Sequence, residues 1–222
     1  MTIRLRYLAA LGAALPIALA GTNAAAQQDS QAHTHIGHVV SGFDGAPDGR
    51  GLAATATAEV GIALLHANFT AGDLSDLAAM QRHAGHVLYL LDPAQGGSGP
   101  GLGFGVIPAV EGVARHIGLA ASAAGASENV RTHAEHVTAI AGGVLANARE
   151  AVEVARQLQS AASIRRAAPL VARLRLLAYQ IAAGSDLNGD GRLSFDGEAG
   201  MQQLEAHLYL LLEGESLPRE LH

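Results

Sequence analysis

The stretch MQRHAGHVLYLLD, from Met80 to Asp92, places two histidines three residues apart in an otherwise apolar segment. Fifty residues further on, VRTHAEHVTAI, from Val130 to Ile140, repeats this arrangement. Apolar residues at helical spacing, abundant alanine and the lack of an alternating strand pattern predict helices at both places. The chain beyond about residue 51 has the same character, so the sequence predicts an all-α protein.

The two histidine pairs belong to a longer internal repeat. At a gapless offset of 50 residues, the aligned histidines are His66 with His116, His83 with His133, and His86 with His136. We therefore predict two copies of one helical hairpin, forming a four-helix bundle over residues 52–161. The expected helices cover about 52–69, 74–91, 109–124 and 127–160.

These six histidines lie on or beside apolar stripes that should face the interior of the bundle. Burying a polar group without a partner costs about 1–3 kcal/mol, so a shared ligand would explain the cluster. Neutral imidazole is a good ligand for zinc, copper or nickel. The repeat allows two three-histidine sites, one per hairpin, or one shared cluster. His35 and His38 in THIGHVV, and His207 in MQQLEAHLYLLLE, are weaker echoes of the same pattern.

Other cofactors and an enzymatic role stay open at this point. Haem b with two axial histidines suits a helical bundle, although it would use only two of the six side chains. Three histidines with an open position are also typical of catalytic zinc, but only Glu59 suggests itself as a general base. The chain has no cysteine, and the Glu-x-x-His and His-Glu-x-x-His motifs are absent, which excludes thiolate, ferritin-like di-iron and zincin sites.

The first 26 residues have the pattern of a secretory signal peptide. Arg4 and Arg6 precede an apolar run, and small residues follow up to Ala26. We expect a periplasmic or secreted protein with no membrane span after cleavage. The remaining chain has twelve arginines, no lysine and 20 acidic residues, which does not favour nucleic-acid binding. Residues 27–51 are polar and glycine-rich, and we expect a flexible, histidine-containing arm there.

The segment SDLNGDGRLSFDGE lies between two further helices, expected at about 164–183 and 196–213. Its candidate calcium ligands are the side chains of Asp186, Asn188, Asp190, Ser194 and Glu198, with the carbonyl of Arg192. The segment resembles an EF-hand calcium loop, with Gly191 at the sharp turn. It departs from that family at the last ligand position, where Gly197 stands between Asp196 and Glu198. The resemblance implies a calcium-binding helical hairpin over residues 163–222, with Glu198, Asp196 or water completing the site.

Together these patterns predict an exported protein that captures, stores or delivers a transition metal and also carries a structural calcium site. The expected partners are metal ions. A haem-binding redox carrier, or a calcium-binding structural protein without a transition-metal site, is the alternative. The sequence favours a binding protein over an enzyme.

Overall fold

A computed structural model describes residues 31–95 and 97–222, and within these residues the protein is helical without strands. The all-α prediction is confirmed. The signal peptide expected at residues 1–26 lies outside the described residues. The main helices are α2 (Leu52–Phe69), α3 (Leu77–Leu91), α4 (Val106–Ser122), α5 (Glu128–Gln159), α6 (Ile164–Ala183) and α7 (Met201–Gly214). Residues 31–40 are also helical, and η1 (Pro47–Gly49) and η2 (Pro93–Gln95) are short 3₁₀ turns.

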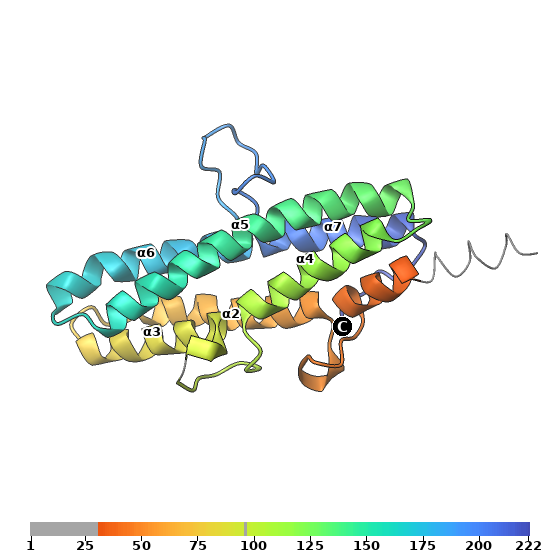
Figure 1. Ribbon diagram of the computed structural model, residues 1–222. Coiled ribbons are helices and arrows are strands. Elements are labelled where there is room, and N and C mark those ends of the chain that lie inside the picture. The colour runs from red at the N-terminus through yellow and green to blue at the C-terminus, as the bar shows by residue number, and fades with distance from the viewer. Residues whose placement is uncertain (1–30, 96) are drawn as a thin grey trace, which may run out of the picture.

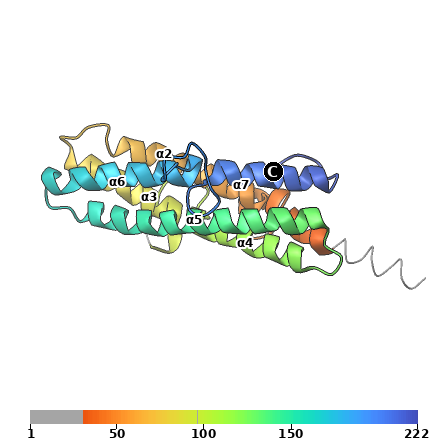
Figure 2. The same cartoon turned by 90° about the horizontal axis from the view of Figure 1, so that it is seen from above.

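Helix α5, with 32 residues, is the longest of the main helices and runs along the length of the bundle. Its N-terminal half packs beside α4 and α7, and its C-terminal half packs beside α3 and α6. Figures 1 and 2 show α6 and α7 lying end to end along α5, with the 185–200 loop projecting where they meet. α2 completes the bundle through contacts with α3, α4 and α6.

Three long loops connect helices of the bundle, whereas α5 is one continuous helix. They comprise residues 41–51 before α2, 92–105 before α4 and 184–200 before α7. Glycine is required at two of the helix boundaries that these loops create. Gly105, the residue before α4, has φ 93°, and Gly184, the residue after α6, has φ 80°. A Cβ atom at Gly184 would also lie 2.5 Å from the carbonyl oxygen of Glu198.

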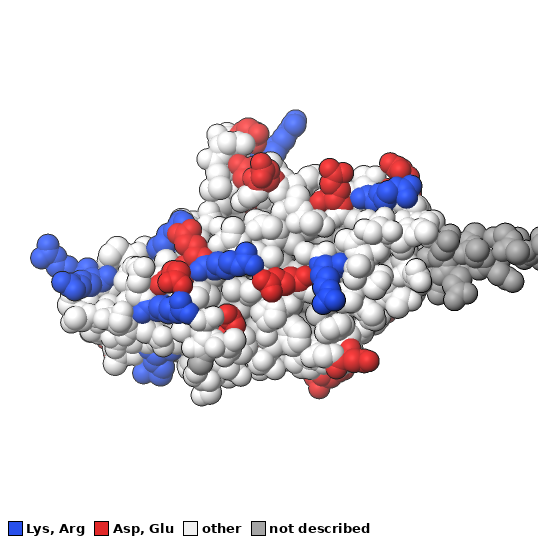
Figure 3. Space-filling model, in the orientation of Figure 1, with Lys and Arg blue, Asp and Glu red and all other residues white. Residues whose placement is uncertain are grey.

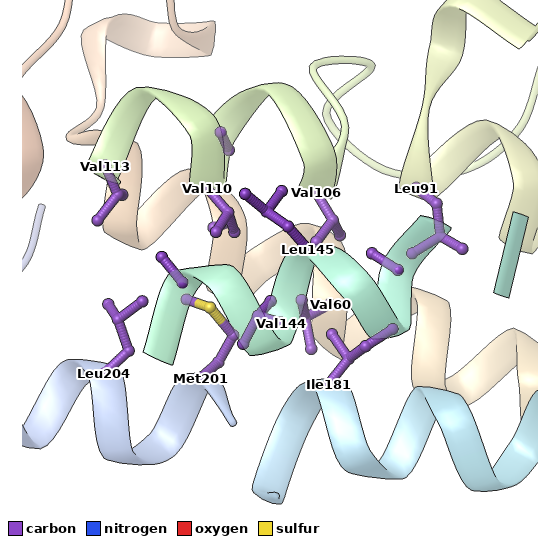
Figure 4. Close-up of a cluster of buried hydrophobic side chains, with 14 of the residues drawn as sticks. Val60, Leu91, Val106, Val110, Val113, Val144, Leu145, Ile181, Met201 and Leu204 are labelled. Carbon is purple, nitrogen blue, oxygen red and sulfur yellow. The ribbon is translucent and has the colours of Figure 1, made fainter. Parts of the chain in front are cut away.

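A single apolar core runs through all the helices. Figure 4 shows side chains from α2, α3, α4, α5, α6 and α7 meeting around Val144 and Leu145 of α5. Ile181 of α6 and Leu204 of α7 belong to this core and are almost fully buried. The C-terminal helices are therefore part of the main bundle. The sequence predicted them as an attached hairpin because it shows each apolar face but not the surface that covers it.

Residues 31–40 form a helix that packs on the bundle, where the sequence predicted a flexible arm. Ile36 and Val39 are fully buried in the core. The segment is also bound to the C-terminus, because the backbone N–H of His222 donates to the carbonyl of Val40 at 2.9 Å. Its apolar residues recur at helical spacing, but the ten helical residues that the structure describes depend on packing for their stability.

The visible surface in Figure 3 mixes acidic and basic side chains. Along α5 they form exposed ion pairs, such as Arg149 with Glu111 of α4 at 2.7 Å and Arg173 of α6 with Glu150 at 2.6 Å. Exposed pairs of this kind contribute little to stability. Among the described residues, α2 is the one helix long and apolar enough to cross a membrane. Core helices of bundles pass the same test, and α2 packs against three other helices.

Candidate metal centres

Nine of the eleven histidines gather in three separate triads. The first triad is His35, His38 and His116; the second is His66, His83 and His86; the third is His133, His136 and His207. In each triad the nitrogen ligand atoms lie within 4.8 Å of one another, and all nine side chains are half-buried. The three groups could each hold a metal ion.

Every triad contains one pair of histidines three residues apart on one helix. The pairs occur in the sequences HIGHV, HAGHV and HAEHV, on residues 31–40, α3 and α5. In all three, the residue after each histidine is buried: Ile36 and Val39, Ala84 and Val87, and Ala134 and Val137. The core thus fixes the rotation of the helix and leaves both imidazoles at the edge of the helix–helix contact.

The third histidine of each triad comes from a neighbouring helix, and its surroundings also repeat. His66, His116 and His207 lie on α2, α4 and α7. The residue that follows each one is fully buried, namely Ala67, Ile117 and Leu208. The third residue before each one, Ala63, Val113 or Leu204, is buried as well. One helix-pair design therefore occurs three times, and the single histidine always faces the pair.

The imidazoles of a triad converge through their Nδ1 atoms. In the first triad, the Nδ1 of His116 lies 3.2 Å from that of His35 and 3.2 Å from that of His38. In the second, the Nδ1 of His66 lies 3.0 Å from that of His83 and 3.1 Å from that of His86. Tetrahedral zinc with Zn–N bonds of about 2.0–2.1 Å holds its nitrogens about 3.3–3.4 Å apart. The observed spacing is close to that arrangement.

The third triad has the same form with one further feature. The Nδ1 atoms of His133 and His207 lie 3.2 Å apart. The Nδ1 atom of His136 is buried and has no hydrogen-bond partner. An unpaired buried nitrogen is costly unless it binds something. A metal ion between these three side chains would satisfy it.

The surroundings of five triad histidines favour the neutral form of the side chain. Burial lowers the pKa of His66, His83, His116, His133 and His207, and nearby histidines of the same triad lower it further. Imidazole coordinates a metal only when it is neutral. The lowered pKa of these five side chains thus favours the form that can bind a metal.

The structure groups the predicted histidines differently from the sequence. His66, His83 and His86 meet as one hairpin, as expected. His116 does not meet His133 and His136, so neither arrangement that the repeat allowed, one site per hairpin or one shared cluster, describes all six histidines. The row of α5 that carries this pair faces α7: the side-chain N–H of Asn129, at the start of that row, donates to the carbonyl of Leu211 at 3.0 Å. His116 faces the helix of residues 31–40 instead, so His35, His38 and His207 complete the triads.

The two remaining histidines bind carboxylates. His33 lies 3.1 Å from Glu215, and His222 lies 2.8 Å from Glu220. Hydrogen bonds from Ser127, Asn129 and His33 lower the pKa of Glu215, outweighing the opposite effect of its burial. Neither histidine is part of a triad.

Glu59, the nearest candidate for a general base, has a structural role. It is fully buried, and its Oε1 atom accepts hydrogen bonds from the backbone N–H groups of Phe104 at 3.0 Å and Gly105 at 3.1 Å. These groups lie at the N-terminus of α4, where an anion is favourable. Glu59 therefore fixes the 92–105 loop and the start of α4.

The 186–198 loop is closed by its own carboxylates. Asp186 accepts hydrogen bonds from the N–H groups of Gly189 at 2.7 Å and Gly191 at 2.8 Å. Glu198 reaches across the loop to the N–H groups of Leu187 at 3.0 Å and Ser194 at 2.9 Å. Its hydrogen bond from Ser194 is the main cause of its lowered pKa. Asp196 is exposed, so Glu198 is the acidic residue of this pair that faces into the loop.

Three phenylalanines beside the triads had no signal in the sequence. Phe43, Phe69 and Phe195 each contact two imidazoles of one triad. Phe69 follows His66 by three residues, whereas Phe43 follows His38 by five and Phe195 precedes His207 by twelve. No fixed spacing links them, so only the folded chain reveals the set.

Comparison of the chain with models of protein families, with curated proteins and with solved structures finds no match. The class of this protein is thus defined by its fold and its sites: a helical bundle with three three-histidine centres.

Proposed function

We propose that this protein binds transition-metal ions at its three histidine triads and serves to capture, store or deliver them. The convergence of nine imidazoles in three equivalent groups is the observation that carries the proposal. The same helix-pair design occurs on three different pairs of elements, which a chance arrangement of surface histidines would not produce. Zinc, copper and nickel are the ions that such ligands suit.

The geometry favours an ion over haem. In a bis-histidine haem, two axial imidazoles bind the iron from opposite faces of a porphyrin. Here three Nδ1 atoms approach one point, at separations of 3.0–3.2 Å in the closest pairs. This spacing leaves no room for a macrocycle between the side chains.

The direct test is elemental analysis of protein purified without a polyhistidine tag and equilibrated with each metal. We expect three ions per chain, and two when His66, His116 or His207 is replaced by alanine. A stoichiometry that stays the same in all three variants would rule out the triads as the binding sites. A Soret band in the absorbance spectrum would instead select haem.

We also propose that the 186–198 loop binds calcium. The match to the EF-hand pattern at Asp186, Asn188 and Asp190 supports this, as does the position of the Glu198 carboxylate across the loop. Calcium prefers such oxygen ligands. The site would act as a brace between α6 and α7.

The proposed setting is outside the cytoplasm. The basic start, apolar run and small residues before Gln27 support export followed by cleavage. Fractionation of cells that express the full chain, with mass spectrometry of the mature N-terminus, tests this point. An intact N-terminus in the cytoplasmic fraction would contradict it.

A further inference from the structure

Each triad has one phenylalanine ring against two of its three imidazoles. The ring of Phe69 lies 5.3 Å from those of His66 and His83, measured between centroids. The ring of Phe43 lies 5.5 Å from His116 and 5.9 Å from His38. The ring of Phe195 lies 4.5 Å from His136 and 4.8 Å from His207. In every triad the ring contacts the single histidine and one member of the pair.

Phe43 and Phe195 also pack against the core, whereas Phe69 does not, so core packing alone does not account for all three contacts. The chain has only four phenylalanines, and three of them lie beside a triad. Phe43 and Phe195 are in different loops, whereas Phe69 ends α2. Phe69 is 45% exposed, so it contributes little to the core. Three unrelated backbone positions thus bring the same side chain to the same place, which points to a role at the metal centre.

A phenylalanine ring has no atom that can bind a metal. In each triad the ring lies beside two imidazoles, so on that side the neighbour of the triad is an apolar side chain and not a further ligand. The triads contain only histidines, with no aspartate or glutamate among the described residues that join them. An ion bound at a triad would therefore have three nitrogen ligands and an apolar ring on one side.

We propose that Phe43, Phe69 and Phe195 determine metal specificity by limiting the coordination number. The sites would accept zinc(II) and copper(I), which are satisfied by three or four ligands, and discriminate against nickel(II), which readily takes six. Raw affinity for nitrogen ligands follows the Irving–Williams order and does not by itself favour zinc over nickel, so a preference for zinc has to come from the geometry of the site. This inference rests on the proposed metal binding at the triads.

The test uses the full chain with a single intact site. His116→Ala and His207→Ala together disable the first and third triads and leave the second. Phe69 is then replaced by alanine, which opens the space, or by leucine, which keeps an apolar side chain there. Because Phe69 is exposed, neither change should disturb folding, and circular dichroism checks this. Zinc(II), nickel(II) and anaerobic copper(I) affinities are measured by competition with chromophoric chelators.

We expect the single-site protein to prefer zinc over nickel, and Phe69→Ala to reduce the zinc-to-nickel ratio by about tenfold or more, chiefly through tighter nickel binding. Phe69→Leu should retain most of the preference. Cobalt(II) gives an independent readout, since its visible bands are strong in four-coordinate sites and weak in six-coordinate ones. We expect strong bands with Phe69 and weaker bands with alanine.

An unchanged zinc-to-nickel ratio and cobalt spectrum in Phe69→Ala would overturn the role of the phenylalanines and leave the proposed metal binding intact. Failure of the single-site protein to bind zinc, copper(I) or nickel would instead overturn metal binding at the triad itself. The two failures are therefore distinguishable in one set of titrations.

Discussion

Replacement of His66 by alanine should remove one metal-dependent contribution to stability. His66 is the ligand that joins α2 to the pair on α3, at 3.0 Å from His83 and 3.1 Å from His86. Without it, the two remaining ligands, His83 and His86, lie on a single helix, so no ion links α2 to α3. The other two triads use different helices and should keep their ions.

The magnitude follows from the linkage between binding and folding. An ion that binds only the folded state at a free concentration 100 times its Kd stabilises that state by about 2.7 kcal/mol. For a domain of about 150–250 residues, 1 kcal/mol shifts the Tm by roughly 2–4 °C. Loss of one site should therefore reduce the zinc-induced rise in Tm by about 5–11 °C. His116→Ala and His207→Ala should each have a similar effect.

Thermal unfolding followed by circular dichroism, with zinc and with a chelator, measures this difference. The chelator-treated variants serve as the reference for any effect of the substitution on packing. His222→Ala is the matched control, because the side chain of His222 is exposed, pairs with Glu220 and belongs to no triad. If zinc raises the Tm of His66→Ala as much as that of the unsubstituted protein, the second triad is not a zinc site.

Three further predictions concern pH, the start of α4 and the calcium loop. Burial lowers the pKa of His207 and other triad histidines below 6.5, so the unfolded metal-free chain binds protons more readily than the folded one. The free energy of unfolding should therefore fall as the pH drops below about 6.5. Equal free energies from urea unfolding at pH 7.5 and 5.5 would refute this. Glu59→Ala leaves the N–H groups of Phe104 and Gly105 unpaired and should lower the free energy of unfolding by about 2 kcal/mol, whereas an unchanged urea midpoint would exclude the capping role. Glu198→Gln should weaken calcium binding by about tenfold or more in calorimetric titration, and equal affinities would exclude Glu198 as a ligand.

Local patterns were sufficient to predict most helices. The expected 52–69 and 164–183 segments coincide with α2 and α6, because both are long runs rich in alanine and leucine, with Gly51 and Ser163 directly before them. The start of α7 was placed too early, since residues 196–200 belong to the loop before Met201. The loop ends there because Gly200 and Glu198 pack against the end of α6.

The composition of the triads was harder to predict. Helix phase indicates that His133 and His136 face another helix, but it does not say which one. In a bundle where α5 contacts four other helices, α4 and α7 both remain candidates. The helix of residues 31–40 posed the same difficulty, because its place opposite His116 depends on contacts distant in sequence. The phenylalanines follow no spacing rule and required the folded structure.

The α5–α6 pair shows what the repeated design would allow. The C-terminal half of α5 packs against α6 much as other helices pair in the bundle, yet neither segment contains a histidine. It has the Glu150–Arg173 ion pair on its surface instead. If the triads bind metal as proposed, the number of ions that the fold can hold depends on how many of its helix pairs carry histidines. Three substitutions on this pair could raise the capacity by one ion without altering the core.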